Sequence, residues 1–178
     1  NVFLGRTNYM LNNVEDSLKY YNFVLKTNPD YYPAYNDMAV LSYVIGEKDE
    51  SINYLIKLYN LDALNDKFSI LFLAESLMEQ NRQDDAKKIM SNLVKNENNS
   101  TIKGVYTSLI NPDRANDESL TKALTLEDVY IRSRLTYYIA CLMERQGVKE
   151  LSKTLFHEVK FTRLGFENKL ALYKLGEL

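Results

Sequence analysis

The chain has 178 residues, 46% of them hydrophobic, and a formal net charge of only −2. A charge this close to zero does not favour binding to nucleic acid or to an anionic membrane surface. With a single cysteine and a single histidine, Cys141 and His157, the chain forms neither an intrachain disulfide nor a metal site made of several Cys and His ligands.

The first part of the chain predicts a pair of helices. The second helix of this pair carries an apolar stripe with the i, i+4, i+7, i+8 spacing of one helix face, formed by Ser17, Tyr21, Val24 and Leu25. The pattern stops at Asn28–Pro29. Pro33 then suits the first turn of the helix that follows, because proline is tolerated there.

Turn signals recur along the chain where paired helices should reverse direction. Glycine and asparagine favour such turns because they tolerate a positive φ. The expected turns lie at Asn12–Asn13, Gly46–Glu47, Asn81–Arg82 and Gly147–Val148. Pro112 is expected late in a helix, beside a loose link from Asn111 to Asn116. The segment from Phe166 to Tyr173 predicts a last amphipathic helix.

Small side chains recur at a nearly constant spacing. The series Ser17, Ser51, Ala86, Ser119 and Ser152 has intervals of 34, 35, 33 and 33 residues. Twelve residues before each stands a second, mostly small series: Gly5, Ala39, Ala74, Thr107 and Ala140. Seven residues after each stands an aliphatic series: Val24, Leu58, Leu93, Leu126 and Val159. These series predict a repeat array of antiparallel helix pairs, helix A and helix B, which cross closely where the small residues meet.

A period near 34 residues with this pattern resembles the tetratricopeptide repeat, or TPR. The first unit carries the resemblance most plainly, through Leu4–Gly5, Tyr9, Leu11, Ser17, Leu18, Tyr21, Val24, Leu25 and Asn28–Pro29. The second unit follows, with Tyr35, Met38–Ala39, Tyr43, Gly46, Ser51–Ile52 and Leu55. The fourth unit departs furthest, because Thr107 stands at its first small position. The resemblance implies an all-α, right-handed solenoid, a superhelix of about five helix-turn-helix units and a C-terminal capping helix.

We expect one TPR-like domain over residues 1–178. Its units are predicted at about 1–31, 32–65, 66–99, 100–132 and 133–164, with the capping helix at about 166–176. The chain begins inside a helix A with the apolar residues Val2, Phe3 and Leu4. We therefore expect a fragment of a longer chain with further repeats or another domain upstream, or a mature chain after processing.

The sequence does not favour an enzyme. His157 directly follows the buried-series residue Phe156, so a surface or half-buried structural histidine is expected. A pair of Cys141 and His157 would still lack the third orienting group and the oxyanion site that nucleophilic catalysis needs. We therefore predict no catalytic residues, no cofactor and no metal. No stretch approaches the roughly 18 apolar residues of a membrane span, so we expect no membrane insertion by this segment.

The second half of the chain carries an excess of basic residues. They comprise Arg132, Arg134, Arg145, Lys149, Lys153, Lys160 and Arg163. At helical spacing such residues usually form a solvated face. A docking patch for an acidic partner is the alternative.

The TPR resemblance also implies where a partner binds. In that family, helix A residues that point away from helix B line the concave wall of the superhelix, where partners commonly bind. In this chain the wall would hold Arg6, Tyr9, Asn36, Asp37, Val40, Tyr43, Leu71, Phe72, Glu75, Met78, Tyr137, Tyr138, Cys141 and Glu144. Such an apolar and aromatic wall suits an extended or helical peptide. Alternatively, superhelical curvature or a neighbouring unit buries these residues as core.

One TPR subclass binds the acidic C-terminal tails of chaperones with a clamp of Lys, Asn and Arg side chains on successive A helices. The matching positions here are Val2, Arg6, Asp37, Phe68 and Phe72. Only Arg6 is basic, and a desolvated Asp37 would repel a carboxylate. We therefore predict that this clamp is absent.

Three hypotheses about function remain open from the sequence. The first is a non-enzymatic scaffold that binds a protein or peptide on the concave wall. The second is a self-assembly module, in which the apolar start of the chain or the tyrosine-rich wall pairs with another copy to form a homo-oligomer. The third is a regulatory or positioning arm of an upstream enzyme.

Overall fold

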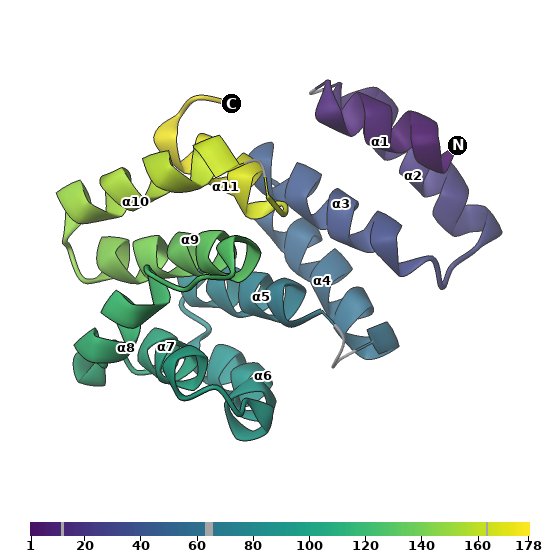
Figure 1. Cartoon of the computed structure of the whole chain (residues 1–178). Coiled ribbons are helices and arrows are strands. Elements are labelled where there is room, and N and C mark those ends of the chain that lie inside the picture. The colour runs from purple at the N-terminus through teal and green to yellow at the C-terminus, as the bar shows by residue number, and fades with distance from the viewer. Residues whose placement is uncertain (12, 63–65, 163) are drawn as a thin grey trace. The chain divides into compact units, whose positions relative to one another are not determined.

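The structure is a computed structural model that describes residues 1–11, 13–62, 66–162 and 164–178. Within these ranges every regular element is a helix (Figure 1). The chain divides into two compact units, Asn1–Ser76 and Leu77–Leu178, which we describe separately. Whether they act as the single domain expected from the sequence stays a prediction.

The first unit contains two helical hairpins and the start of a fifth helix. The first hairpin is α1 (Val2–Met10) with α2 (Val14–Thr27), and the second is α3 (Tyr32–Val44) with α4 (Lys48–Asp62). Helix α5 (Lys67–Glu79) begins here and ends in the second unit. Pro33 lies in the first turn of α3, as predicted. Gly46 has a φ of +89° and turns the chain from α3 into α4, which confirms the second predicted turn.

The core of this unit lies between its two hairpins. Buried residues of α2 and α3 form one apolar cluster: Tyr21, Ala34, Met38 and Leu41. Partly buried Tyr9 and Leu18 pack against this cluster from the first hairpin, and Tyr54 packs against it from the second. Helix α3 is buried along most of its length because α1, α2 and α4 all pack on it. The second hairpin is therefore held by apolar contact with the first.

The second unit continues with α6 (Gln83–Asn96), α7 (Ser100–Ile110), α8 (Asp117–Ala123), α9 (Val129–Arg145), α10 (Lys149–Thr162) and α11 (Glu167–Leu175). The predicted turns at Asn81 and Gly147 are confirmed, since these residues have φ values of 58° and 79°. Side chains of Asn99, Asn116 and Asp128 cap the starts of α7, α8 and α9. The predicted turn at Asn12–Asn13 falls partly on Asn12, which lies outside the described residues, as does Arg163 of the basic set.

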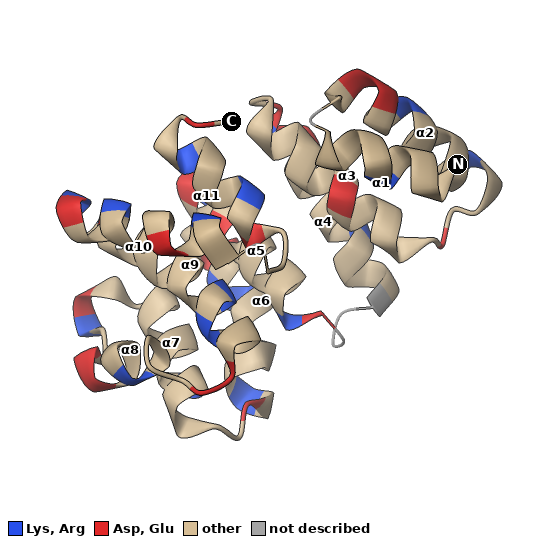
Figure 2. Ribbon diagram, turned by 45° about the horizontal axis from the view of Figure 1, so that its top comes forward, with Lys and Arg blue, Asp and Glu red and all other residues tan. Residues whose placement is uncertain are grey.

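Basic and acidic residues are interspersed with uncharged ones along the helices (Figure 2). Acidic residues occupy the first turns of α2, α4, α6 and α8, where they stabilise the positive end of the helix dipole. The helices therefore bury their apolar faces and keep most of their charges in water.

The five predicted small residues, Ser17, Ser51, Ala86, Ser119 and Ser152, are all buried, with at most 9% of their surface exposed. In the first hairpin the Ser17 hydroxyl donates to the Gly5 carbonyl across the crossing of α1 and α2, over 2.9 Å. A Cβ atom added at Gly5 would lie only 3.0 Å from the Tyr21 ring. The predicted close crossing of this hairpin is confirmed.

The fourth hairpin, α7 with α8, corrects the predicted register. Thr107 is exposed, and its hydroxyl donates to the Lys103 carbonyl of its own helix. The small residue that faces Ser119 is Gly104, where an added Cβ atom would lie 2.1 Å from the Ser119 hydroxyl oxygen. The two helices therefore cross one turn earlier than the series predicted, because only glycine leaves room for Ser119.

The structure also corrects the position of Pro112. Helix α7 ends at Ile110, and Pro112 opens a short 3₁₀ turn, Pro112–Arg114, inside the link that was expected to be loose. Proline disfavours the helical conformation of the residue before it. Asn111 accordingly has φ −133° and ψ 72°. Helix α9 begins at Val129, before the expected unit boundary at 133.

Candidate partner-binding surface

Most of the predicted concave wall is buried. At most 3% of the surface is exposed at eight of its fourteen residues: Val40, Tyr43, Leu71, Phe72, Glu75, Tyr137, Tyr138 and Cys141. The rings of Tyr43 and Phe72 meet edge to face at 5.3 Å, and Tyr137 packs between Tyr138 at 5.1 Å and Phe156 at 5.6 Å. These side chains pack the helices together, as the alternative to an open wall proposed. The accessible members are Arg6, Tyr9, Asn36, Asp37, Met78 and Glu144.

In the first unit, three of the accessible residues gather around one buried hydroxyl. The Tyr21 side chain is 1% exposed, and its hydroxyl donates to a carboxylate oxygen of Asp37. Arg6 and Tyr9 of α1 lie near enough to interact electrostatically with the same phenol. Helices α1, α2 and α3 therefore each contribute to this cluster of Arg6, Tyr9, Tyr21 and Asp37, which we call the Tyr21 cluster.

The electrostatics of the Tyr21 cluster fix its protonation. Burial raises the pKa of the Tyr21 phenol, and the hydrogen bond to Asp37 raises it further. The phenol therefore stays neutral and acts as a donor at physiological pH. This donor holds the Asp37 carboxylate in one orientation, at a position that is only partly buried. The sequence assigned Tyr21 to the core and did not indicate its hydrogen bond.

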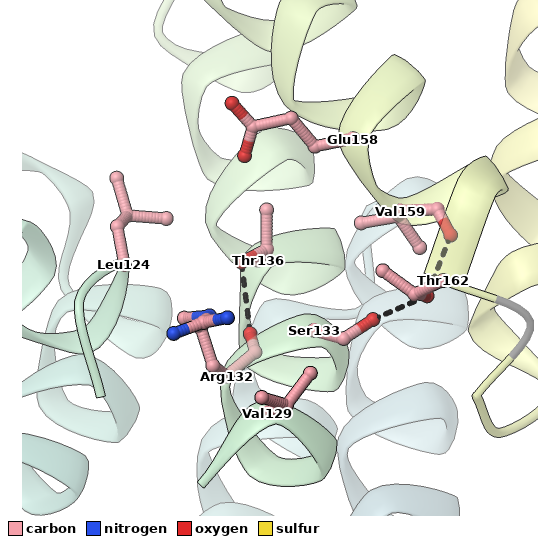
Figure 3. A pocket seen from close by; sticks show the side chains of 8 residues that line it. All are labelled: Leu124, Val129, Arg132, Ser133, Thr136, Glu158, Val159 and Thr162. Atoms are coloured by element: carbon pink, nitrogen blue, oxygen red, sulfur yellow. Dashed lines mark hydrogen bonds between the residues drawn. The ribbon is translucent and has the colours of Figure 1, made fainter. Parts of the chain in front are cut away.

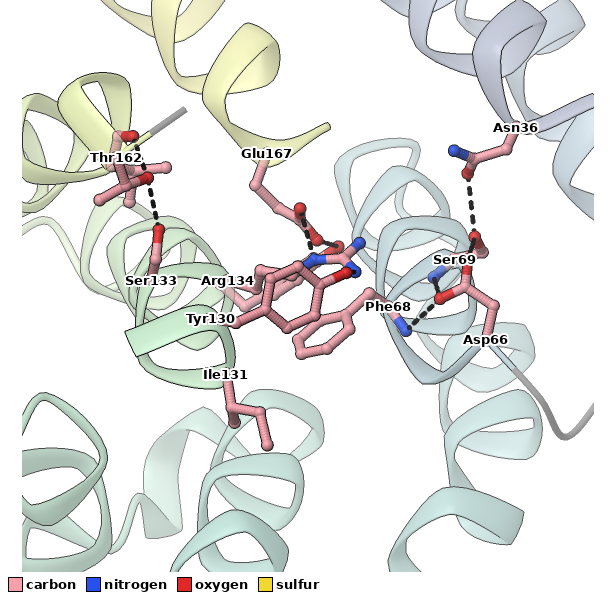
Figure 4. A network of polar contacts seen from close by, with 12 residues as sticks. Asn36, Asp66, Phe68, Ser69, Tyr130, Ile131, Ser133, Arg134, Thr162 and Glu167 are labelled. Atoms are coloured by element: carbon pink, nitrogen blue, oxygen red, sulfur yellow. Dashed lines mark hydrogen bonds and ion pairs between the residues drawn. The ribbon is translucent and has the colours of Figure 1, made fainter. Parts of the chain in front are cut away.

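Asn36 belongs to a second polar group in the first unit (Figure 4). Its side-chain oxygen accepts from the Ser69 hydroxyl at 2.9 Å. Asp66 accepts from the backbone N–H groups of Phe68 and Ser69 and thereby caps the start of α5. Asn36 thus ties α3 to the first turn of α5.

In the second unit, Glu144 belongs to a charged group with Lys174 and Glu79. The Lys174 ammonium donates to Glu79 at 2.6 Å and to Glu144 at 2.8 Å. Burial alone would lower the pKa of Lys174, but the neighbouring Cys141, Glu79 and Glu144 outweigh it and raise this pKa above its usual value. Lys174 therefore stays charged and holds the end of α11 to α9.

The arrangement of helices resembles a solved TPR structure. YrrB, described as a TPR protein with an unusual peptide-binding site, superposes with a TM-score of 0.55 over 98% of this chain and 90% of its own, at 15% sequence identity. The chain has a tetratricopeptide-repeat fold. The predicted fold class, an all-α TPR-like solenoid, is thereby confirmed. Neither a protein-family model nor a curated protein matches the sequence.

The capping helix α11 is fixed to the last hairpin of the TPR fold by a buried ion pair (Figure 4). Arg134 Nε donates to Glu167 Oε2 at 2.7 Å, and the Tyr138 hydroxyl donates to Glu167 Oε1 at 3.2 Å. Arg134 also donates to the Tyr130 hydroxyl at 2.6 Å and lies 4.8 Å from the Phe166 ring centre. Arg134 is only 5% exposed, so its expected place on a solvated basic face is wrong.

Glu167 is fully buried. Burial raises its pKa to about 7, although Arg134 and Tyr138 act in the opposite direction. Arg134, Tyr138 and Glu167 are sealed from solvent, and their bonds serve packing.

A hollow of about 140 Å³ lies between α8, α9 and α10 (Figure 3). Four of its polar residues are bonded within the protein. The Ser133 and Thr162 hydroxyls share a hydrogen bond of 2.6 Å, and the Arg132 guanidinium donates to the Leu126 carbonyl at 2.7 Å. The Thr136 hydroxyl donates to the Arg132 carbonyl at 2.8 Å. These bonds occupy most of the polar lining, in which Glu158 is exposed.

His157 is half-exposed, as predicted, and its Nδ1 lies 4.0 Å from Glu177 Oε1. Among the described residues, no group of three or more His, Cys, Asp or Glu side chains could hold a metal ion. The helices in the described part of the chain are all too short or too polar to cross a bilayer.

Proposed function

We propose that this chain is a non-enzymatic scaffold that binds a peptide or protein partner through its A helices. The Tyr21 cluster is the observation that carries the proposal, because it brings Arg6, Tyr9 and Asp37 together from two successive A helices. Arg6 is exposed, and Tyr9 and Asp37 are half-buried. The fold shared with YrrB, a protein described by its peptide-binding site, supports the same conclusion.

The chemistry of the Tyr21 cluster suits the backbone of an extended peptide. Asp37 offers an oriented acceptor for a peptide N–H, and Arg6 offers a fork of donors for a carbonyl or a carboxylate. Tyr9 adds an aromatic surface beside them. The acceptor is already held by Tyr21, so binding does not have to order it first.

Peptide display with the whole chain tests this proposal. Peptides selected on the unmodified protein are then measured against Asp37→Ala and Arg6→Ala, with Asn53→Ala on the exposed face of α4 as the matched control. We expect Asp37→Ala to weaken binding by about tenfold, which corresponds to one lost charge-assisted hydrogen bond. The control should bind like the unmodified protein. Selected peptides that bind all three variants equally would contradict the proposal.

Self-association is the second candidate function, and exposed apolar residues on α1 favour it. Phe3 is 86% exposed and Met10 is 76% exposed, with Leu4 and Leu11 nearby in sequence also exposed. Patches of this kind often mark an interface. Light scattering at increasing concentration should detect a dimer that Phe3→Ser/Met10→Ser abolishes. A strictly monomeric chain would exclude this candidate.

A further inference from the structure

A hollow of about 430 Å³ lies in the second unit, where the end of α9 and the start of α10 meet the end of α11. It is larger than the hollow of Figure 3, and its polar rim is basic. Its walls are formed by Glu144 of α9, by Lys149, Ser152, Lys153 and Phe156 of α10, and by Lys174 and Leu175 of α11. Of these residues only Glu144 belongs to the wall predicted from the sequence.

The lysines of the hollow are not equivalent. Lys174 is already paired with both Glu79 and Glu144, so its positive charge is fully engaged within the protein. Lys149 and Lys153 are one turn apart on α10, and both are exposed. Within the described part of the chain, neither of them forms an ion pair. One rim of the hollow therefore carries two positive charges that face solvent.

The lining of the hollow also includes two apolar side chains. Phe156 is 2% exposed, and Leu175 is partly buried at the end of α11. The methylene groups of Lys149 and Lys153 extend the apolar surface toward the rim. A ligand that fits this surface needs an apolar group for Phe156 and Leu175 and negative charge for the rim.

The same helix already binds a carboxylate from this chain. Lys160 of α10 donates to both carboxylate oxygens of Glu177, at 2.9 and 2.8 Å, and His157 lies 4.0 Å from one of them. Lys153 lies close enough to Glu177 to contribute to the field at that carboxylate. The basic side of α10 thus accepts one carboxylate beyond the hollow, and Lys149 and Lys153 repeat the same chemistry at the hollow itself.

We propose that this hollow binds an acidic peptide segment of a protein partner, with an aliphatic or aromatic side chain on Phe156 and Leu175 and flanking carboxylates on Lys149 and Lys153. The proposal rests on the scaffold function above and assigns a partner chemistry to the second unit. A nucleic acid fits less well, because binding its phosphate backbone takes a larger basic surface than Lys149 and Lys153 provide, and the chain carries a net charge of −2 overall.

Three fluorescein-labelled peptides test the proposal by fluorescence anisotropy with the whole chain. The first carries one Leu between Glu and Asp residues, the second replaces each acid by Lys, and the third replaces the Leu by Ser. We expect the first to bind, the third to bind more weakly and the second not to bind. Affinity should also fall as salt is added, because the contacts at the rim are exposed. Equal binding of the acidic and the basic peptide would overturn the proposal.

A charge-matched pair of variants separates the hollow from general electrostatics. Lys149→Glu/Lys153→Glu should weaken binding of the acidic Leu peptide by at least about tenfold, because two attractive contacts become repulsive. Lys87→Glu/Lys88→Glu makes the same change in net charge on the exposed face of α6 and should leave binding nearly unchanged. Circular dichroism checks that both variants keep their helices. An equal loss in the two variants would overturn the assignment.

Two further measurements locate the site and separate it from the Tyr21 cluster. In NMR titrations the acidic Leu peptide should shift the signals of Phe156 and Leu175, and a shift confined to the first unit would contradict the proposal. The Asp37→Ala variant should bind the acidic peptide as tightly as the unmodified protein does. If the acidic peptide does not bind at all, the proposal for the hollow fails, and binding of display-selected peptides at the Tyr21 cluster is still tested separately. A single-stranded oligonucleotide that binds more tightly than the acidic peptide, and loses binding in the Lys149→Glu/Lys153→Glu variant, would replace the peptide assignment.

Discussion

The two units use similar polar groups in opposite ways. In the first unit, Tyr21 holds Asp37 at a partly open surface, with Arg6 exposed beside them. In the second unit, Arg134 and Glu167 are 5% and 0% exposed and hold the capping helix to α9. An arginine, a tyrosine and a carboxylate therefore form a structural link where they are sealed, and where they are accessible they form the cluster that we propose as a recognition surface.

The largest expected effect is at the sealed pair. Arg134→Ala leaves the Glu167 carboxylate buried without its cation, which should lower the free energy of unfolding by about 3–5 kcal/mol. Urea denaturation measures this loss. Arg82→Ala removes an exposed pair with Asp85 and should change stability by less than about 0.5 kcal/mol. Similar losses of stability in Arg134→Ala and Arg82→Ala would contradict the distinction between sealed and exposed polar groups.

The crossing of α7 and α8 in the second unit should be almost as sensitive. Gly104→Ala places a methyl group against Ser119 and should cost about 1–3 kcal/mol, although alanine favours a helix. Thr107→Ala, on the exposed face of the same helix, should cost little. Thermal melts compare the two variants. Adding Ser119→Gly to the Gly104→Ala variant should recover part of the lost stability. If Gly104→Ala alone causes no loss of stability, the corrected register is wrong.

The pH dependence of stability should report on Glu167. Its pKa is about 7 in the folded chain against a usual 4.5, so the folded state binds this proton more tightly than the unfolded state. The resulting stabilisation is complete below about pH 4.5 and is lost as the pH rises through 7. We expect the melting temperature to fall between pH 5 and pH 8, by about 2–4 °C for each 1 kcal/mol lost.

Glu167→Gln is the control for this titration, because glutamine stays neutral at every pH. The variant should have a nearly flat melting temperature between pH 5 and pH 8. The exposed Glu118 has a lowered pKa and so does not titrate in this window. A slope of the same size in Glu167→Gln would assign the titration to another group.

The smallest effect is expected in the Tyr21 cluster. Tyr21→Phe removes the donor to Asp37 and should cost about 1 kcal/mol, because the carboxylate remains accessible to water. Tyr59→Phe is the matched control on α4, where the structure shows no hydrogen bond of this hydroxyl among the described residues. Chemical denaturation should distinguish the two. A loss of stability in Tyr21→Phe as large as that in Arg134→Ala would mean that the Tyr21 cluster is as inaccessible to water as the Arg134–Glu167 pair.

Much of the fold could be predicted from the sequence, because the repeated features depend on local chemistry. The turns at Gly46, Asn81 and Gly147 follow from their tolerance of positive φ. The burial of Ser17 and Ser51 follows from the close approach of paired helices. In the fourth unit the same reasoning failed, because spacing alone pointed to Thr107 and the contact is made by Gly104.

The candidate site was less accessible to sequence analysis. The family pattern names positions on helix A, but it does not say which of them neighbouring helices cover. The sequence therefore left open whether residues such as Tyr43 and Tyr138 line an open wall or belong to the core, where the structure places them. The Tyr21 hydrogen bond to Asp37 joins residues of different hairpins and has no local signal. The same holds for the hollow at Lys149 and Lys153, which three helices form together.

The contact between Gly104 and Ser119 has an evolutionary consequence. Each position sets the size that the other can accept, so substitutions at the two should be correlated among homologous sequences. A homologue with a bulkier residue at position 104 should carry glycine at position 119, or its two helices should lie further apart at this crossing. Covariation between these two positions would thus record the geometry of the hairpin in the history of the family.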